Sequence, residues 1–341
     1  MQISTISKAS PLARRLLTIS LFTITAACTP LSPKVGLAEE AIQVAQSTEQ
    51  VPGYYHMQLG DFQVTALYDG MNPIPTALLK GISERDIQTL LADQFVPINK
   101  DGVQTAVNGF LVNTGNDLIL VDAGAAACFG PRLGGLAKSL RSAGYEAEQV
   151  SKVFLTHLHG DHACGITVDG KMAFPNATIY VSEDEADHWL NKEIAAQAPK
   201  AAQPFFQFAQ DAVAPYIAAG KLKRFAAGES LVDGVSSLSL PGHTPGHEGY
   251  MFSSADQQLL VWGDVIHSHA VQFPNPQVSV DFDSDQKQAI ASREKILARA
   301  AQEKFWVAGA HMPFPGIGHV SKQETGYRWI AAEYSPVTSD K

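Results

Sequence analysis

A short segment in the middle of the chain gathers the side chains best suited to bind metal ions. Three histidines and an aspartate, His157, His159, Asp161 and His162, directly follow the apolar run 153–155. Neutral imidazoles and a carboxylate are costly to bury without polar partners, and a divalent cation supplies such a partner. His157 and His159 can converge on one ion, while Asp161 and His162 can turn toward a second. The spacing therefore predicts a dinuclear hydrolytic centre.

Three later segments carry the remaining candidate ligands. His243 lies in Gly-His-Thr-Pro-Gly-His, Asp264 follows Trp-Gly, and His311 follows Ala-Gly-Ala. A lone H-x-H would be weak evidence, because an incidental surface pair is the more common origin of such a pattern. An ordered set of seven candidate ligands is specific. A binding-only protein would be expected to have lost some of these ligands, and none of the seven is missing.

The ordered ligand set resembles the signature of the metallo-β-lactamase fold. Short matches away from the ligands also resemble the methyl parathion hydrolase family, at 107–109, 270–273 and 314–319 among others, over nearly the whole chain after its amino-terminal segment. The resemblance implies an α/β protein with an αββα sandwich, in which the metal site lies at the strand ends, and it implies a homodimer. The alternation of strand-like and helix-like segments along the chain agrees with such a sandwich.

The resemblance also divides the ligands between two ions. His157, His159 and His243 would hold one ion, Asp161, His162 and His311 the other, and Asp264 would bridge them. Histidine-rich ligation favours zinc, with iron, manganese or cobalt as alternatives. Two such ions would lower the pKa of a shared water from 15.7 toward about 7, and the resulting hydroxide would attack the substrate. Asp264, as the bridge, and Asp161, as a candidate proton shuttle, are the predicted catalytic residues.

An aromatic pocket beside the metals is a further implication of the resemblance. Phe129, Trp189 and Phe205 are the matching positions, with Phe206 as the alternative to Phe205 because the surrounding insertion differs slightly in length. Each of these aromatic residues taken alone is about as often a core residue as a pocket residue. The wall that they would form together suits an aryl leaving group.

Several polar residues are expected to support the ligands. Asp122 follows a strand, and we expect it to accept hydrogen bonds from the metal loop, because ligand imidazoles need an orienting partner. His247 is expected to be a supporting or structural residue. His267 and His269 are expected near the rim of the pocket, and His188 on the surface.

The chemistry of the predicted centre leaves three hydrolase functions open. Hydrolysis of an aryl phosphotriester such as methyl parathion is the function that the resemblance implies first. The alternative is hydrolysis of a lactone or an aryl carboxyl ester, as in acyl-homoserine lactonases, and β-lactamase activity ranks third. Reduction of oxygen or nitric oxide at a di-iron centre of the same fold is disfavoured, since that branch typically has glutamate where His159 stands.

The predicted elements place each ligand segment next to an apolar strand-like run. Between the first metal loop and His243 lies a mostly helical insertion, which we expect to shape the substrate pocket. It contains 182–191, with Ser182 and Glu185 as a capping box, and 202–219, where two prolines should break the regularity of the helix. A later helix is expected over 284–302, with Asp283 or Ser284 as its cap.

The amino-terminal segment indicates export. Residues 1–38 combine a basic start with an apolar stretch too short to span a bilayer, which predicts an export signal peptide and a periplasmic protein. Residues 39–52 are expected to be a flexible spacer, 53–335 the hydrolase domain and 336–341 a tail. The alternative is a lipid anchor at Cys28, and no membrane span is expected.

The net charge of the chain limits the kinds of partner that it can bind. A formal net charge of −9 argues against a nucleic-acid partner, because binding of a polyanion requires a basic face. The expected partner is therefore a small-molecule substrate.

The sequence contains three cysteines, Cys28, Cys128 and Cys164. Export permits a disulfide between Cys128 and Cys164, but two separate buried thiols are the interpretation that we favour. Cys164 as a further metal ligand is disfavoured, since the seven ligands already complete a two-metal set.

Overall fold

The computed structural model describes residues 44–337. The chain divides into two compact units, Met1–Glu49 and Gln50–Lys341. The predicted signal peptide, the lipidation site at Cys28 and the first part of the spacer lie outside the described residues. Residues 44–52 contain no helix or strand. Among the described residues, no helix is long and apolar enough to cross a membrane.

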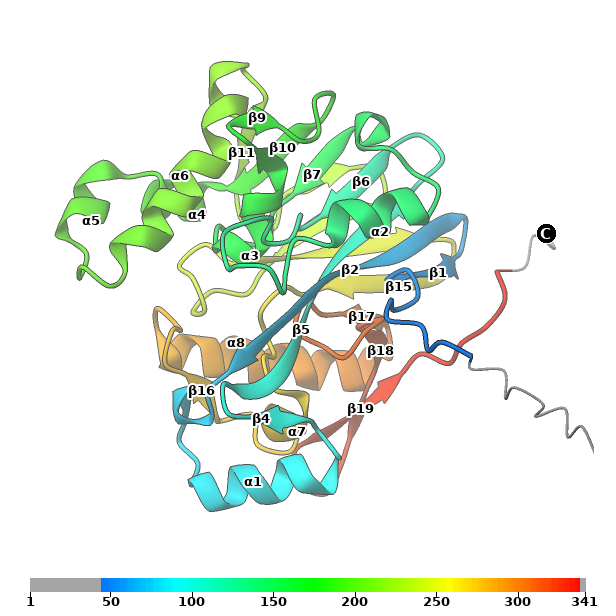
Figure 1. Ribbon diagram of the computed structural model, residues 1–341, viewed down its shortest axis with the longest axis vertical. Coiled ribbons are helices and arrows are strands. Elements are labelled where there is room, and N and C mark those ends of the chain that lie inside the picture. Colours follow the sequence, from blue (N-terminus) through cyan, green and yellow to red (C-terminus); the bar gives the residue numbers. More distant parts are fainter. Residues whose placement is uncertain (1–43, 338–341) are drawn as a thin grey trace, which may run out of the picture. The chain divides into compact units, whose positions relative to one another are not determined.

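Two mixed sheets form the centre of the larger unit (Figure 1). The first sheet contains β1 (Tyr54–Leu59), β2 (Phe62–Ile74), β5 (Gly102–Asn113), β6 (Leu118–Val121), β7 (Lys152–Phe154), β10 (Thr178–Ser182) and β11 (Leu222–Phe225) in that order, with β4 (Ile98–Asn99) also paired to β5. The second sheet contains β12 (Ser230–Val232), β13 (Val235–Ser239), β14 (Glu248–Ser254), β15 (Gln257–Val261), β17 (Trp306–Ala308), β18 (Ile317–Lys322) and β19 (Tyr327–Ala331). Two short ribbons join β3 (Leu79–Lys80) to β16 (Ser279–Val280) and β8 (Thr167–Val168) to β9 (Lys171–Met172).

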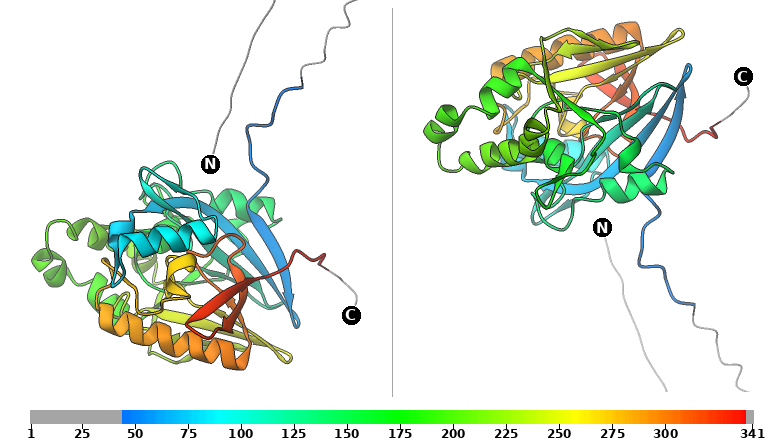
Figure 2. Two further views of the ribbon diagram at one scale, coloured as in Figure 1. Left: turned by 90° about the horizontal axis from the view of Figure 1, so that it is seen from below. Right: turned by 90° about the horizontal axis from the view of Figure 1, so that it is seen from above.

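Helices surround the two sheets (Figures 1 and 2). They are α1 (Glu84–Asp93), α2 (Leu136–Ser142), α3 (Gly160–Ala163), α4 (Glu183–Trp189), α5 (Lys192–Gln197), α6 (Gln203–Ala218), α7 (His269–Gln272) and α8 (Gln286–Glu303). One apolar cluster joins side chains of the two sheets, such as Phe154 and Tyr250. A second joins α2 and α6 to the first sheet, and a third joins α8 to the second sheet. This layering confirms the predicted αββα sandwich.

Two helical predictions need correction. Helix α6 is continuous, although two prolines were expected to interrupt it. Pro204 lies in the first turn, where its missing N–H has no partner to lose. Pro215 lies near the end, and the helix continues past it because Tyr216 is buried and its hydroxyl donates to the carbonyl of Ile166 at 2.9 Å. Helix α8 begins later than expected, with Asp285 as its cap.

The two cysteines form a disulfide, so the expectation of two separate thiols is wrong. The Cα atoms of Cys128 and Cys164 are 6.4 Å apart. Backbone hydrogen bonds bring their loops together, because Ala123 donates to the carbonyl of His162 and Gly165 donates to that of Gly124. The disulfide therefore ties the segment that carries Phe129 to the segment that carries the first metal ligands.

Candidate metal centre

The seven predicted ligands come together where strands of both sheets end. His157, His159, Asp161 and His162 follow β7, and the other three lie in the segments after β13, β15 and β17. Ligand atoms of His157, His159, His243 and Asp264 lie within 4.8 Å of one another, and so do those of Asp161, His162 and His311. We call these sets the first and the second ligand group. The structure thus brings together the residues that the resemblance assigned to each ion, and Asp264 also forms a third such group with His267 and His311.

Asp264 stands between the two groups. One carboxylate oxygen, Oδ1, lies 3.1 Å from Nε2 of His162, in the second group. The other, Oδ2, lies 3.2 Å from Nε2 of His243 and 3.0 Å from Nε2 of His311. A carboxylate in this place can offer one oxygen to each of two ions.

Unsatisfied polar atoms show that the cluster fits divalent cations. Nε2 of His157, Nε2 of His162 and Oδ1 of Asp264 are buried and have no hydrogen-bond partner in the described part of the chain. Nε2 of His162 approaches Oδ1 of Asp264 closely, yet without the geometry of a hydrogen bond. Such atoms are expensive to bury, and they are the donor types that bind zinc and similar metals. The residues therefore fit two divalent ions.

The opposite ring nitrogens are held by hydrogen bonds. Nδ1 of His162 donates to Asp122 at 2.8 Å, Nδ1 of His243 donates to Asp283 at 2.9 Å, and Nδ1 of His311 donates to the carbonyl of Ala106 at 2.9 Å. Each bond fixes the tautomer that leaves Nε2 free to bind a metal. Asp122 thus lies where the sequence placed it. Asp283, expected as a helix cap, instead orients a ligand.

Two further histidines lie against Asp264. His247 accepts a hydrogen bond from the backbone N–H of Asp264 at 3.0 Å and donates from Nδ1 to the carbonyl of Leu240, so it supports the backbone of the ligand. His267 was expected near the rim, but it is buried, with Nε2 3.1 Å from Oδ2 of Asp264. Its ring stacks on that of His311, with the centroids 5.0 Å apart. The only sequence signal for this placement is its position three residues after Asp264.

Charges and burial set the protonation of the cluster. Burial, followed by neighbouring histidines, lowers the pKa of His157 and His159 well below the usual value. Burial acts to raise the pKa of Asp264, but the surrounding imidazoles, His162 and His311 first, hold it well below its usual range. Burial also acts to lower the pKa of His162, His243 and His311, but the nearby carboxylates, Asp264 first, raise it in all three, to about 9 in His243. An ionised Asp264 therefore faces imidazoles that carry protons, and binding of metal ions would release those protons.

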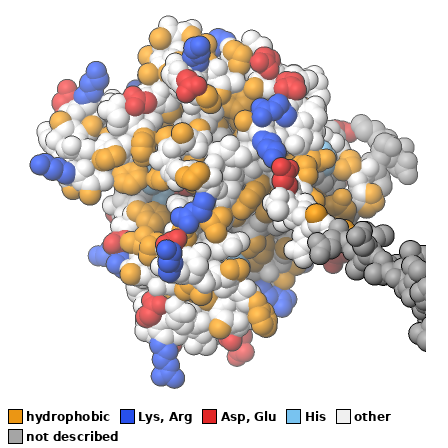
Figure 3. Space-filling model, viewed as in Figure 1, with side chains coloured by type: hydrophobic (Ala, Val, Ile, Leu, Met, Phe, Trp, Pro, Cys, Tyr) orange, Lys and Arg blue, Asp and Glu red, His pale blue; other side chains and the backbone are white. Residues whose placement is uncertain are grey.

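A cavity of about 880 Å³ opens onto the ligands, and its lining includes His159, Asp161, Asp264 and His311. Phe129, Trp189 and Phe205 lie in its wall, together with the alternative Phe206. The ring of Trp189 lies edge-on to that of His159, with centroids 5.1 Å apart. On the face shown in Figure 3, hydrophobic side chains gather at the base of α5 and α6. The predicted aromatic residues thus lie beside the ligands.

His188 needs a correction, because it lines this cavity and is half-buried instead of lying on the open surface. Helix α6 folds back over α4, so that the ring of Phe206 lies 5.2 Å from that of His188. This contact is long-range, and the sequence around His188 carries no signal for it.

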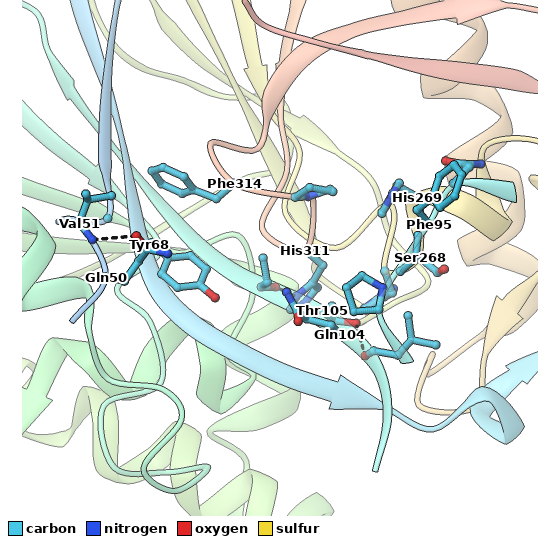
Figure 4. A pocket seen from close by; sticks show the side chains of 18 of the residues that line it. Gln50, Val51, Tyr68, Phe95, Gln104, Thr105, Ser268, His269, His311 and Phe314 are labelled. Atoms are coloured by element: carbon cyan, nitrogen blue, oxygen red, sulfur yellow. Dashed lines mark hydrogen bonds between the residues drawn. The ribbon is translucent and has the colours of Figure 1, made fainter. Parts of the chain in front are cut away.

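A second cavity of about 670 Å³ lies on another side of His311 (Figure 4). Tyr68, Phe95 and Phe314 contribute aromatic rings to its lining. Thr105, His267 and His311 line both cavities. None of the described lysines or arginines lines either cavity. The surroundings of the ligands are therefore apolar apart from the ligands themselves and a few neutral polar groups.

Sequence comparisons identify related proteins. The sequence model of the metallo-beta-lactamase superfamily matches residues 102–311. An N-acyl homoserine lactonase from Bacillus sp is 27% identical over 196 residues, which cover 57% of this chain and 65% of that protein. The N-acyl homoserine lactonase AiiA from Bacillus thuringiensis subsp. kurstaki is 26% identical with the same coverage. The chain thus spans just under two thirds of the length of these curated relatives.

Solved structures extend the similarity over most of the chain. The hydrolase AbOPH of the beta lactamase superfamily is 41% identical, with a TM-score of 0.81, and the match covers 84% of this chain and 100% of that one. AidC, a dizinc quorum-quenching lactonase solved with the product N-hexanoyl-L-homoserine, is 30% identical, with a TM-score of 0.76 and coverage of 83% and 99%.

Proposed function

The chain belongs to the metallo-beta-lactamase superfamily and is a metal-dependent hydrolase, and we propose that it opens the lactone ring of N-acyl homoserine lactones. The observation that carries this proposal is the large cavity on the two ligand groups, whose wall is aromatic and, within residues 44–337, contains no lysine or arginine. Such a cavity suits an uncharged, partly apolar substrate. The similarity to proteins named as lactonases supports the same choice.

Two metal ions, most simply zinc, would activate a water as nucleophile and polarise the carbonyl oxygen of the lactone. His157, His159 and His243 would hold one ion, Asp161, His162 and His311 the other, with Asp264 shared. The histidine-rich ligand set favours zinc, and AidC is described as a dizinc enzyme.

The chain's own side chains would handle the substrate and its protons. The aromatic wall of Phe129, Trp189 and Phe205 would pack against the apolar part of the substrate and exclude water from the reacting bond. Opening of a lactone ring creates an alkoxide, which must take up a proton. Asp161 is a carboxylate that borders the cavity, with its Oδ2 3.6 Å from Nε2 of His311, and it is the candidate to take the proton that the attacking water gives up and to pass it to the alkoxide.

Phosphotriester hydrolysis, which the sequence favoured first, becomes the second candidate. The observation in its favour is the aromatic wall, which also suits an aryl leaving group. A phenolate of low basicity leaves without a proton, so this reaction would need Asp161 as a metal ligand but not as a proton shuttle. β-Lactam hydrolysis remains third, because most β-lactam antibiotics carry a carboxylate and, among the described residues, no lysine or arginine lines either cavity to bind it.

We also propose an exported, periplasmic protein that forms a homodimer. The disulfide between Cys128 and Cys164 supports an oxidising compartment. The alternative is an exported protein that is attached to the membrane by a lipid anchor at Cys28. Measurement of the mass of the protein in solution tests the homodimer.

The test of the lactonase proposal is direct detection of the ring-opened product. Zinc-loaded protein incubated with N-hexanoyl-L-homoserine lactone should form N-hexanoyl-L-homoserine, and protein stripped by a chelator should not. Ring opening at the spontaneous rate by the zinc-loaded protein would refute the proposal.

A further inference from the structure

Glu185 is a buried carboxylate that the metal chemistry described above does not use. It lies in the first turn of α4, and its side chain is fully buried. The sequence predicted that it would bond back to Ser182 in a capping box. The structure shows only half of that box, because the hydroxyl of Ser182 accepts from the N–H of Glu185 at 3.3 Å while the carboxylate points elsewhere.

The carboxylate of Glu185 joins two loops that carry metal ligands. Oε1 accepts a hydrogen bond from the backbone N–H of Leu158 at 2.8 Å, and Oε2 accepts one from that of Gly246 at 3.1 Å. Leu158 stands between His157 and His159, and Gly246 stands three residues after His243. One side chain therefore fixes the backbone of both loops of the first ligand group.

The amino-terminal end of α4 also packs directly on the second of these loops. The hydroxyl of Ser182 donates to the carbonyl of Gly246 at 2.6 Å. A side chain at position 246 would overlap the backbone nitrogen of Glu185. No space for solvent separates the helix from the loop at this point, so water cannot readily replace the carboxylate.

The second ligand group is held by different partners. Asp122 orients His162, and the carbonyl of Ala106 orients His311. Glu185 makes no hydrogen bond to the backbone of these residues among the contacts of the described chain. Asp122 also accepts hydrogen bonds from the N–H and the hydroxyl of Thr156, next to His157, so this residue supports both halves of the centre. The hydrogen bonds of Glu185, in contrast, go to the segments of His157, His159 and His243, so its loss should affect the two halves unequally.

We propose that Glu185 is a positioning residue that holds the loops of the first ligand group together and thereby sets the affinity of the first metal ion. The inference rests on the proposed metal centre but not on the identity of the substrate. A merely structural role would instead predict a loss of stability that is shared by both ions.

Glu185→Gln tests the proposal with little change in volume. Its amide can accept one of the two N–H groups, but its NH₂ must face the other, so one hydrogen bond is lost. Loss of a residue that supports the metal ligands without binding the metal itself typically lowers metal affinity 10–100-fold. We expect the first ion to bind about 10–100-fold more weakly and the second ion to keep its wild-type affinity.

Glu248→Gln is the matched control. Glu248 is another buried glutamate, in β14. Its side chain takes no part in the contacts between α4 and the metal loops. This variant should bind both ions as the wild type does. Competition with a chelator measures the two affinities, and NMR of the cobalt-loaded protein assigns each ion through the shifted Nδ1–H signals of His162, His243 and His311.

Three results would overturn the proposal. The first is wild-type affinity for both ions in Glu185→Gln, the second an equal loss of both ions, and the third the same loss in Glu248→Gln. If Glu185→Gln does not fold, Ser182→Ala decides, since it removes the bond to Gly246 and should weaken the first ion alone. A wild-type protein that binds no metal would refute the centre itself, which is a distinguishable failure.

Discussion

The metal-ligand cluster and the inserted helices α4 to α6 face the same cavity, but they are built in different ways. The ligands follow strand ends, and most are almost fully buried, with hydrogen bonds behind them. The insertion presents apolar side chains that remain partly exposed, such as Phe205 at 37% and Ile194 at 36%. This difference indicates a division of tasks, in which the cluster performs the hydrolysis and the insertion selects what is hydrolysed.

The largest effect should come from Asp264→Asn. The substitution removes the negative charge that both ligand groups share, while it preserves the size of the side chain. Metal affinity and the rate of hydrolysis of every substrate should fall together. The fall should exceed the 10–100-fold loss of metal affinity that follows removal of a residue that only supports the ligands. Metal content and kcat/KM are measured on the same preparation, with circular dichroism as the control for folding. Unchanged activity would refute the assignment of the hydrolytic reaction to the metal-ligand cluster.

Removal of the metals should have a smaller but general effect. Without ions, the buried atoms His157 Nε2, His162 Nε2 and Asp264 Oδ1 lack partners. A ligand at 100 times its Kd contributes about 2.7 kcal/mol, and each kcal/mol shifts Tm by about 2–4 °C in a protein of this size class. Chelation should therefore lower Tm by at least about 5 °C, and zinc should restore it. An identical Tm before and after chelation would contradict a filled centre.

Phe205→Ala should sharpen the contrast, because it alters the insertion and leaves the cluster intact. Burial of an aromatic side chain contributes about 1.5–3 kcal/mol, and Phe205 is only partly buried. We expect kcat/KM for a long-chain lactone to fall by about tenfold, with two ions still bound. The matched control is Ile217→Ala on the outer side of α6, where the side chain is 52% exposed and lines neither cavity. Equal effects of the two changes would argue against selection by the cavity wall.

The smallest predicted effect concerns pH and a side chain that lines neither cavity. Burial raises the pKa of Glu248 from 4.5 to about 7. Between these values the unfolded chain releases the proton while the folded protein keeps it, so the contribution of Glu248 to stability is lost as the pH rises from about 4.5 to 7. Glu248→Gln should flatten the decline in unfolding free energy over this range by up to about 3 kcal/mol. Denaturant unfolding at a series of pH values measures it, and a decline as steep as in the wild type would refute the assignment.

The ligand cluster could be predicted from the sequence because its information is local. His157, His159, Asp161 and His162 occupy neighbouring positions, and each later ligand follows an apolar strand. The same alternation of strands and helices predicted the sandwich. Asp122 was predictable for a related reason, since a carboxylate at a strand end beside ligand imidazoles has few other partners.

Contacts between distant segments could not be predicted in this way. The spacing of Ser182 and Glu185 predicts a local capping bond, but the carboxylate finds two backbone N–H groups that only the folded chain brings near. Asp283 resembled a helix cap and instead orients His243. The disulfide of Cys128 and Cys164 and the inward position of His267 likewise depend on loops that meet through the sheets.

The most direct test of the central claim is the ratio of two specificity constants on the same metal-quantified protein. We would measure kcat/KM for N-decanoyl-L-homoserine lactone and for methyl paraoxon. The account predicts that the lactone leads by at least about tenfold, because the largely apolar wall of the cavity suits its acyl chain and Asp161 can pass on the proton that its alkoxide needs. A phosphotriester that leads by the same factor would leave the metal centre in place but would contradict the assignment of the cavity to lactones.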